Sequence, residues 1–131
     1  SERNKAEGEA FLAANKTRQG VISLPSGLQD EVLTEEQRVR PRADQTVTTN
    51  YRGTLIDGTE FDSSYKRGMP AVFPVNGVIP GWTEALQLMK GGSKWKLYVP
   101  AALAYGERSP GGAIGPNQTL IFEIELVSIH E

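Results

Sequence analysis

The stretch Val75–Met89 reads VNGVIPGWTEALQLM and decides the fold, because it supplies one short helix with a strongly apolar face. Its apolar residues follow the i, i+3, i+4, i+7 spacing of an amphipathic helix: Trp82, Ala85, Leu86 and Met89. Pro80 suits the first helical turn, where the N–H that proline lacks would be unpaired anyway. We therefore predict a helix that begins near Pro80. A tryptophan beside the preceding Pro-Gly turn raises the question of which surface its indole forms.

The segments on either side of this helix predict β-strands. Apolar and polar residues alternate over 46–55, 94–99 and 119–129, and a further strand is expected near Leu28–Leu33. In the second segment we expect Trp95, Leu97 and Val99 on one side, with Tyr98 among lysines on the other. Since one short helix is available to cover several antiparallel strands, the predicted class is α+β, a curved sheet with the helix in its concavity.

The first part of the chain differs in composition. Residues 1–18 are charged and alanine-rich, which predicts a helix that ends near Gly20. Its apolar residues form a thin stripe: Ala6, Ala10, Phe11, Ala13 and Ala14. We expect a solvated helix that packs lightly on the domain, and the alternative is the end of a longer connector helix. The predicted division is an extension with lead-in over 1–26 and a domain over 27–131, and we expect that upstream sequence has been cut away.

Composition excludes several classes of function. The 131 residues carry a net charge of −2 and contain no cysteine, so thiol chemistry and thiolate metal sites are absent, and no basic footprint for nucleic acid is present. No apolar run reaches the roughly 20 residues of a membrane helix, and no signal peptide is visible. The single histidine is His130, near the C-terminus. The run 57–62 lacks the alternating acids of a calcium loop, and the glycines form no phosphate-binding motif, so we expect neither a metal nor a cofactor.

A set of apolar and aromatic residues near predicted turns remains unassigned by this pass. Its members are Tyr51, Phe61, Phe73, Val78, Ile79, Trp82, Tyr105, Ile114 and Phe122. Asp62 is nearly the only charge among them. The simpler interpretation is that these residues are the core. The alternative is a binding surface, because several of them fall at strand ends and loop bends, where binding residues gather.

Four motifs give a resemblance to a known family. VTTNYRGTLIDGTEFDSS, VIPGWTEALQLM, YVPAALAYGERSPGG and GPNQTLIFEIELVSI resemble, in order, those of FKBP-type peptidyl-prolyl cis-trans isomerases, over about residues 27–129. The preceding segment is similar to the linker of the bacterial Mip-like group, the macrophage infectivity potentiators. The resemblance implies a highly twisted antiparallel half-barrel wrapped around one short helix.

The resemblance also implies a site. Trp82 would form the floor of a pocket for a proline ring, Phe61 and Phe122 would stand beside it, and Asp62 would occupy its polar side. The Ile79 N–H and the Tyr105 hydroxyl would hold ligand carbonyls. The remaining binding positions implied by the family are Tyr51 and Phe73 as walls, Val78 and Ile79 as the rim, and Ile114 over the mouth. Such a cavity needs no catalytic base, because rotation about an X-Pro bond breaks no σ bond.

The implied function is peptidyl-prolyl cis-trans isomerisation (rotamase activity) that assists protein folding. The alternative is a chaperone or proline-binding module that uses the same groove without turnover. Implied partners are X-Pro polypeptides and macrolides of the tacrolimus and rapamycin type, with no nucleic acid and no membrane insertion. We expect this fragment to be a monomer, whereas Mip-like relatives form homodimers through an N-terminal region. The resemblance implies a periplasmic, outer-membrane or secreted bacterial location, with the cytoplasm left open.

Overall fold

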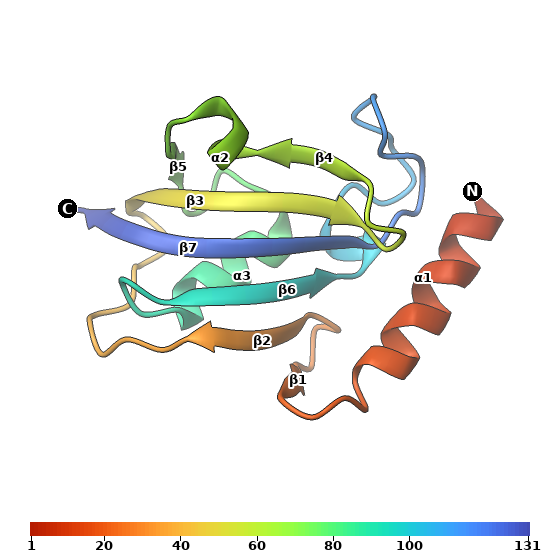
Figure 1. Ribbon diagram of the computed structural model, residues 1–131, viewed down its shortest axis with the longest axis horizontal. Helices are drawn as coiled ribbons and strands as arrows, with labels where there is room; N and C mark the ends of the chain where they lie inside the picture. The colour runs from red at the N-terminus through yellow and green to blue at the C-terminus, as the bar shows by residue number, and fades with distance from the viewer.

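One antiparallel sheet with a short helix in its hollow makes up most of the computed structural model, which describes residues 1–131 (Figure 1). The elements in chain order are α1 (Glu2–Asn15), β1 (Val21–Ser23), β2 (Gln29–Thr34), β3 (Thr46–Leu55), β4 (Glu60–Ser63), α2 (Ser64–Arg67), β5 (Ala71–Pro74), α3 (Pro80–Leu88), β6 (Lys94–Val99), η1 (Ala101–Leu103) and β7 (Leu120–His130). The strand order is β1-β2-β6-β7-β3-β4, and β5 pairs with β3. The predicted α+β class and sheet-around-helix arrangement are confirmed.

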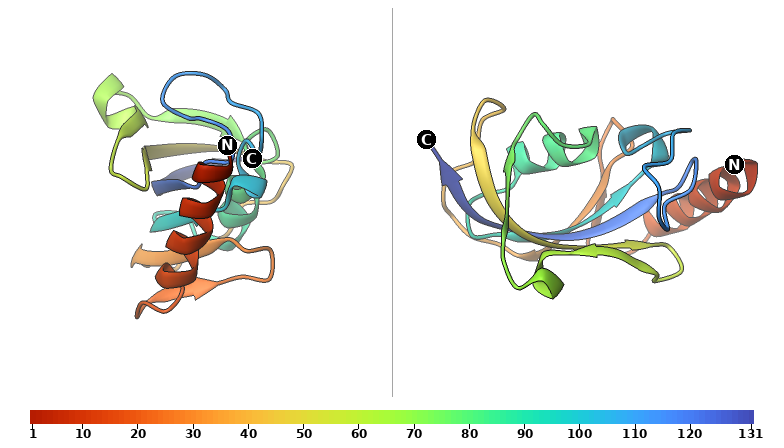
Figure 2. Two further views of the ribbon diagram at one scale, coloured as in Figure 1. Left: turned by 90° about the vertical axis from the view of Figure 1, so that its right-hand side faces the viewer. Right: turned by 90° about the horizontal axis from the view of Figure 1, so that it is seen from above.

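Helix α3 lies in the concave side of the sheet, as the view from above shows (Figure 2). Pro80 is its first residue, and Trp82, Ala85 and Leu86 are buried against the inner faces of the strands. The inward residues of β7, such as Leu120 and Ile124, are fully buried, which confirms the alternation predicted for this strand. The core is therefore the space between α3 and the concave face, and the same helix begins beside the candidate site.

Strand β3 changes partner along one edge. It pairs with β7 along its whole length, while its other edge pairs with β5 at Thr46–Thr49 and with β4 at Arg52–Thr54. Between these two partners the Tyr51 N–H donates to the Ser64 hydroxyl oxygen at 2.8 Å, and that hydroxyl donates to the Asn50 side-chain oxygen at 3.0 Å. Helix α2 therefore fills the gap between β4 and β5 and satisfies the backbone there.

Helix α1 packs against one end of the sheet (Figure 1). The four alanines of the thin stripe are exposed and Phe11 is partly buried, as in a solvated helix that packs lightly on the domain. The buried residues are Gly8 and Asn15. Asn15 donates from Nδ2 to Gln29 Oε1 at 2.8 Å, and a Cβ on Gly8 would lie 2.3 Å from Thr119 Oγ1. Gly8 and Asn15 are thus buried through shape and hydrogen bonding, which apolar periodicity does not detect.

Tyr98 lies on the side of β6 that was predicted for it, and helix α1 buries it there. It is only 2% exposed, because Phe11 of α1 covers it with ring centroids 6.0 Å apart. The Tyr98 hydroxyl donates to Glu31 Oε1 at 2.7 Å and accepts from Arg18 Nη1 at 3.2 Å. The convex side of β6 is thus partly a docking surface for α1. Neither α1 nor any other helix of the structure is both long and apolar enough to cross a bilayer.

Candidate functional site

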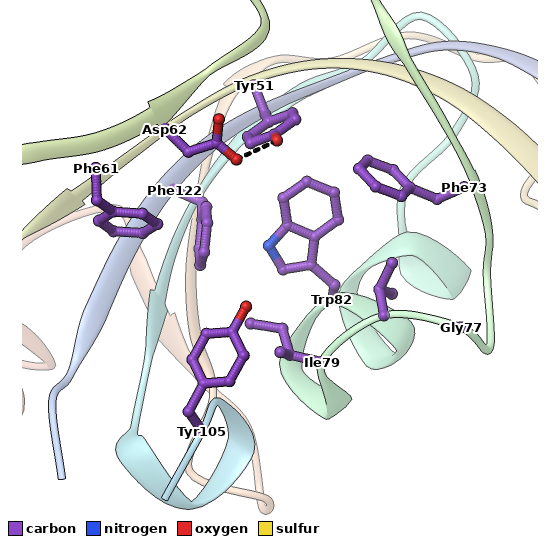
Figure 3. A pocket seen from close by; sticks show the side chains of 10 residues that line it. Tyr51, Phe61, Asp62, Phe73, Gly77, Ile79, Trp82, Tyr105 and Phe122 are labelled. Carbon is purple, nitrogen blue, oxygen red and sulfur yellow. Dashed lines mark hydrogen bonds between the residues drawn. The ribbon is translucent and has the colours of Figure 1, made fainter. Parts of the chain in front are cut away.

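A cavity of about 470 Å³ opens where α3 begins, beside the inner faces of β3, β4 and β7. Its lining residues come from six separate segments: Tyr51, Phe61, Asp62, Phe73, Gly77, Val78, Ile79, Trp82, Tyr105 and Phe122. Figure 3 shows their side chains converging on one space. Nine of the ten residues predicted from the sequence lie here. The space above the indole is therefore open, rather than filled by core packing.

Trp82 stands at the centre of the apolar side of this cavity. Its ring packs edge-to-face with Tyr51, Phe73 and Phe122, at centroid distances of 5.1, 5.4 and 5.3 Å and interplanar angles of 85–86° (Figure 3). Such perpendicular pairs are the favoured arrangement of aromatic rings. Although Trp82 is only 4% exposed, it lines the cavity, so the indole forms a rigid floor.

Gly53 of β3 allows two further rings to reach the cavity. Phe61 and Phe122 pack edge-to-face with centroids 5.6 Å apart. A Cβ on Gly53 would lie 2.6 Å from Phe61 Cζ and 2.9 Å from Phe122 Cε1, distances that real Cβ atoms essentially never show. Glycine is therefore required here for close approach of the rings to the strand rather than for a special backbone angle.

Asp62 is the one acidic residue of the lining, and its carboxylate accepts from three donors, one of which is the Ser63 N–H at 2.9 Å. The Tyr51 hydroxyl donates to one carboxylate oxygen and the Arg67 guanidinium to the other (Figure 3 shows the first bond). Arg67 also donates from Nη2 to the Tyr51 oxygen at 3.1 Å. Arg67 lies on the short helix α2, which Ser63 caps by accepting from the Lys66 N–H and which ends at Gly68 with φ 72°. Both oxygens of Asp62 are therefore fixed by neighbours.

These contacts set the charges of the polar side. Burial alone would raise the pKa of Asp62, but the hydrogen bonds from Tyr51 and Arg67 outweigh it, and the pKa lies below its ordinary value. Burial raises the pKa of the Tyr51 phenol, and its hydrogen bond to Asp62 acts in the same direction. At neutral pH the site thus contains a carboxylate, a guanidinium and a neutral phenol.

Two hydrogen-bond donors at the cavity have no acceptor within the protein. The Ile79 N–H lies just before α3 and donates to neither a backbone nor a side-chain oxygen, although the Ile79 carbonyl accepts from Trp82 and Thr83. The Tyr105 hydroxyl also makes no hydrogen bond, and its side chain is 41% exposed (Figure 3). Because buried or half-buried donors are normally satisfied, these two are available to a ligand.

Three residues depart from the set chosen on the sequence. Ile114 is 7% exposed, packs in the hydrophobic core and is not among the lining residues. Gly77 lines the cavity but lies in a loop whose sequence gave no signal for it. Arg67 completes the polar side, and only its position in space, opposite β4, identifies it. No group of three or more His, Cys, Asp or Glu side chains is arranged to hold a metal ion.

Comparison with known proteins identifies the family. The family model described as FKBP-type peptidyl-prolyl cis-trans isomerase matches residues 37–127, and that of the domain amino-terminal to it matches residues 1–32. The outer membrane protein MIP of Legionella longbeachae is 59% identical over 98% of this chain, and the peptidyl-prolyl cis-trans isomerase Mip of Coxiella burnetii is 53% identical over 96%. In both cases the chain covers 55% of the relative, so it spans about half the length of these curated relatives.

Solved structures agree with this comparison. The crystal structure of FkpA from Escherichia coli is similar with a TM-score of 0.93 and 43% identity, over 98% of this chain and 60% of that one. A peptidyl-prolyl cis-trans isomerase from Pseudomonas syringae gives a TM-score of 0.92 at 38% identity, over 99% and 96% of the two chains. The family match over 37–127, the Mip relatives and the shared fold lead to one conclusion: this chain belongs to the FKBP-type peptidyl-prolyl cis-trans isomerases, in their Mip-like group.

Proposed function

We propose that the cavity above Trp82 catalyses cis–trans rotation about X-Pro bonds in polypeptides and thereby assists their folding. The observation that supports this most is a pair of unpaired donors, the Ile79 N–H and the Tyr105 hydroxyl, at the edge of an aromatic cavity. A proline ring is apolar and the peptide carbonyls on either side of it are acceptors. The cavity therefore offers a surface for each part of an X-Pro segment.

The chemical step follows from the electronic structure of the amide. Its barrier of about 18–20 kcal/mol is the resonance lost when the bond twists. The twisted amide has less charge separation than the planar one, so an apolar site disfavours the planar ground state relative to the twisted state. Trp82, Phe61 and Phe122 supply such surroundings. An acceleration of about a millionfold requires about 8 kcal/mol, and no bond-breaking group is needed to provide it.

Orientation of the substrate is the second contribution to the lower barrier. A carbonyl held by the Ile79 N–H and another held by the Tyr105 hydroxyl would fix the chain on both sides of the proline in a bent conformation. Asp62 acts as a positioning residue in this proposal, because its carboxylate already accepts from Tyr51 and Arg67. A free carboxylate facing a carbonyl oxygen would repel it, whereas this pairing keeps the Tyr51 ring and α2 in place beside the floor.

Further proposals concern the ligands, the domain division, the location and the oligomeric state of the whole protein. We propose that macrolides of the tacrolimus and rapamycin type bind above Trp82, since their pipecolyl ring resembles proline. Ile114, a residue of the 106–117 loop whose side chain packs in the core, would anchor that loop over the bound ligand. We also propose an extension over 1–26 and a catalytic domain over 27–131. A relative named an outer membrane protein supports an envelope or secreted location, and a homodimer remains our proposal for the full-length protein.

The test is a protease-coupled assay of isomerisation on a Leu-Pro peptide. Tyr105→Phe removes one hydrogen bond to the substrate and should lower kcat/KM about three- to tenfold. Asp62→Leu leaves Arg67 and Tyr51 without their shared acceptor and should lower kcat/KM about tenfold or more. Tyr65→Phe and Asp44→Leu are matched controls at exposed positions outside the cavity and should turn over like the parent.

Two results would contradict this proposal. If both cavity variants keep parental turnover, the assignment of these residues is wrong. If the parent binds proline peptides but does not accelerate their isomerisation, the alternative of a non-catalytic chaperone or proline-binding module is correct. Chemical-shift mapping with a proline-mimicking ligand locates the binding in either case.

A further inference from the structure

A second cavity lies on the concave side near the C-terminal end of α3, away from the aromatic cavity. Its volume is about 300 Å³. Its apolar walls are Ile22, Leu24, Val32, Leu88 and Trp95, and Asp30 of β2 lies among them. None of its residues lines the first cavity. Because the two cavities adjoin opposite ends of one nine-residue helix, they are separate sites.

Asp30 is a buried carboxylate without a partner. Its exposed fraction is 2%, and it lies two positions after the fully buried Leu28, which directly precedes β2. Its side chain accepts no hydrogen bond and forms no ion pair within 4.0 Å, unlike Asp62 in the first cavity. Buried carboxylates are normally paired or hydrogen-bonded, since transfer of an ion from water to a protein interior is costly. The Asp30 carboxylate lies in the wall of a cavity and has neither a hydrogen-bond donor nor a cation as partner.

The charged side chains around the cavity do not supply the missing partner. Arg40 Nε donates to the Leu88 carbonyl at 3.0 Å, and Lys90 Nζ lies 3.4 Å from Gln37 Oε1. Glu35 adds a further carboxylate to the lining. Burial first, and the neighbouring Glu84 carboxylate second, raise the pKa of Asp30 to about 6. Asp30 therefore has no cation in direct contact, although Arg40 and Lys90 line the same cavity.

The rim of the cavity is open and apolar. Ile22 is 54% exposed, Leu88 38% and Val32 37%, although all three are large hydrophobic residues. The Trp95 Nε1 is buried and has no hydrogen-bond partner. A ligand that enters here would therefore cover apolar surface at the rim and meet a carboxylate inside.

We propose that this second cavity binds an aliphatic ammonium group, with the ammonium at Asp30 and the alkyl chain between Ile22, Val32 and Leu88. An ammonium supplies three donors and the charge that Asp30 lacks. Its alkyl chain removes exposed apolar surface from water, which favours binding. A free alkylamine and a lysine side chain of a polypeptide share this chemistry, and both fit a cavity of about 300 Å³. A carboxylate or phosphate group placed directly against Asp30 would be repelled by that carboxylate.

The indole N–H signals of the two tryptophans allow a direct test by NMR. Trp95 lines the second cavity and Trp82 the first, so each signal reports on one site. Titration with n-butylammonium should give a saturable shift of the Trp95 signal and leave that of Trp82 unchanged. 1-Butanol and pentanoate, which carry the same butyl chain without the positive charge, should bind at least about tenfold more weakly, because a charge-assisted hydrogen bond is lost.

Variants and pH complete the test. Asp30→Asn should weaken binding of n-butylammonium about tenfold or more, whereas Asp44→Asn, at an exposed carboxylate outside the cavity, should change it little. With a pKa of about 6 for Asp30, affinity at about pH 5 should be roughly tenfold below that at about pH 7.5. A lysine peptide without proline distinguishes the two sources, since it shifts Trp95 only if a side chain enters. The proposal is wrong if n-butylammonium gives no saturable Trp95 shift, or if 1-butanol binds equally well.

Discussion

Gly53 lies against two rings of the aromatic cavity, and a single methyl group there tests how closely the floor is packed. In Gly53→Ala the new Cβ would meet Phe61 and Phe122 at distances below 3 Å, so at least one ring must move. Overpacking of this kind costs about 1–3 kcal/mol, and displaced rings would change the cavity. We expect lower thermal stability together with reduced kcat/KM on a Leu-Pro peptide.

The control for this change is Gly91→Ala. Its Cβ would meet no atom closer than 3.5 Å, in ordinary contact with Arg38, and no positive φ is required. Stability and turnover should both stay near the parental values. Equal losses in the two variants would show that the effect of Gly53 does not depend on the rings.

Asp30 gives the protein a predictable dependence of stability on pH. Its folded-state pKa of about 6 lies above the ordinary value of 3.8, so the folded state binds the proton more tightly than the unfolded state. The free energy of unfolding should therefore fall as the pH rises from about 4 to about 6, by an amount on the order of 1–3 kcal/mol from this group. Thermal unfolding across this range measures the effect.

A neutral isostere separates this contribution from those of other groups. Asp30→Asn should be more stable than the parent above about pH 6, and the difference should vanish below about pH 4, where both carry no charge. Glu35→Gln, at an exposed position, should follow the parent at every pH. Parallel curves for the parent and Asp30→Asn would contradict the assignment of the raised pKa to this carboxyl.

At the scale of single elements, α1 combines good helix-forming residues with a docking face that contains a glycine. Alanine normally stabilises a helix by about 1 kcal/mol relative to glycine. In Gly8→Ala we expect a lower free energy of unfolding, because the Cβ would lie 2.3 Å from Thr119 Oγ1 and displace the helix from the sheet. Faster hydrogen exchange of the α1 amides and greater exposure of Tyr98 should follow.

The reverse change on the exposed side of the same helix provides the control. Ala10 is exposed, so Ala10→Gly should reduce the stability of α1 only by the difference in helix propensity, about 1 kcal/mol. Isomerase activity should be kept in both variants, since α1 contributes no residue to the aromatic cavity. A Gly8→Ala protein that is more stable than the parent would show that the helix adjusts without undocking.

Long elements with one apolar face were predictable from the sequence, and short elements were not. The alternation in β3, β6 and β7 and the helical spacing in α3 gave nearly correct bounds. In contrast, β4, β5 and α2 have four residues each, too few for a period to appear. The burial of Gly8 and Asn15 in α1 was not predictable, because it comes from shape and hydrogen bonding rather than from hydrophobicity.

The candidate site was predictable to the extent that its residues stand in motifs. The aromatic residues and Asp62 belong to stretches that resemble the family, and the structure brings them to one cavity. Arg67 was missed because no local pattern links it to Asp62, five positions earlier on another element. Asp30 was missed for a similar reason: a lone acid in a polar-looking strand reads as exposed, and only the sheet register and α3 reveal that it is buried.

At the scale of the whole molecule, the aromatic cavity is assembled from β3, β4, β5, β7, α3 and the loops on either side of it. A ligand that contacts all of these segments should stabilise the folded state as one unit. A macrolide with a pipecolyl ring at about one hundred times its Kd should add about 2.7 kcal/mol to the free energy of unfolding. Thermal unfolding with and without the macrolide measures this, and Tyr105→Phe should reduce the shift. An unchanged melting temperature at saturating macrolide would contradict the proposed binding.

Helix α3 also gives the molecule an electrical direction, because the peptide dipoles of its nine residues align. The positive end, at Ile79, opens on the aromatic cavity, where a ligand would present carbonyl oxygens with partial negative charge. The negative end, near Leu88, opens on the second cavity, where the proposed guest is a cation. Helix α3 thus presents a partial positive charge to the aromatic cavity and a partial negative charge to the second cavity. A ligand whose charge suits one cavity is therefore electrostatically disfavoured in the other.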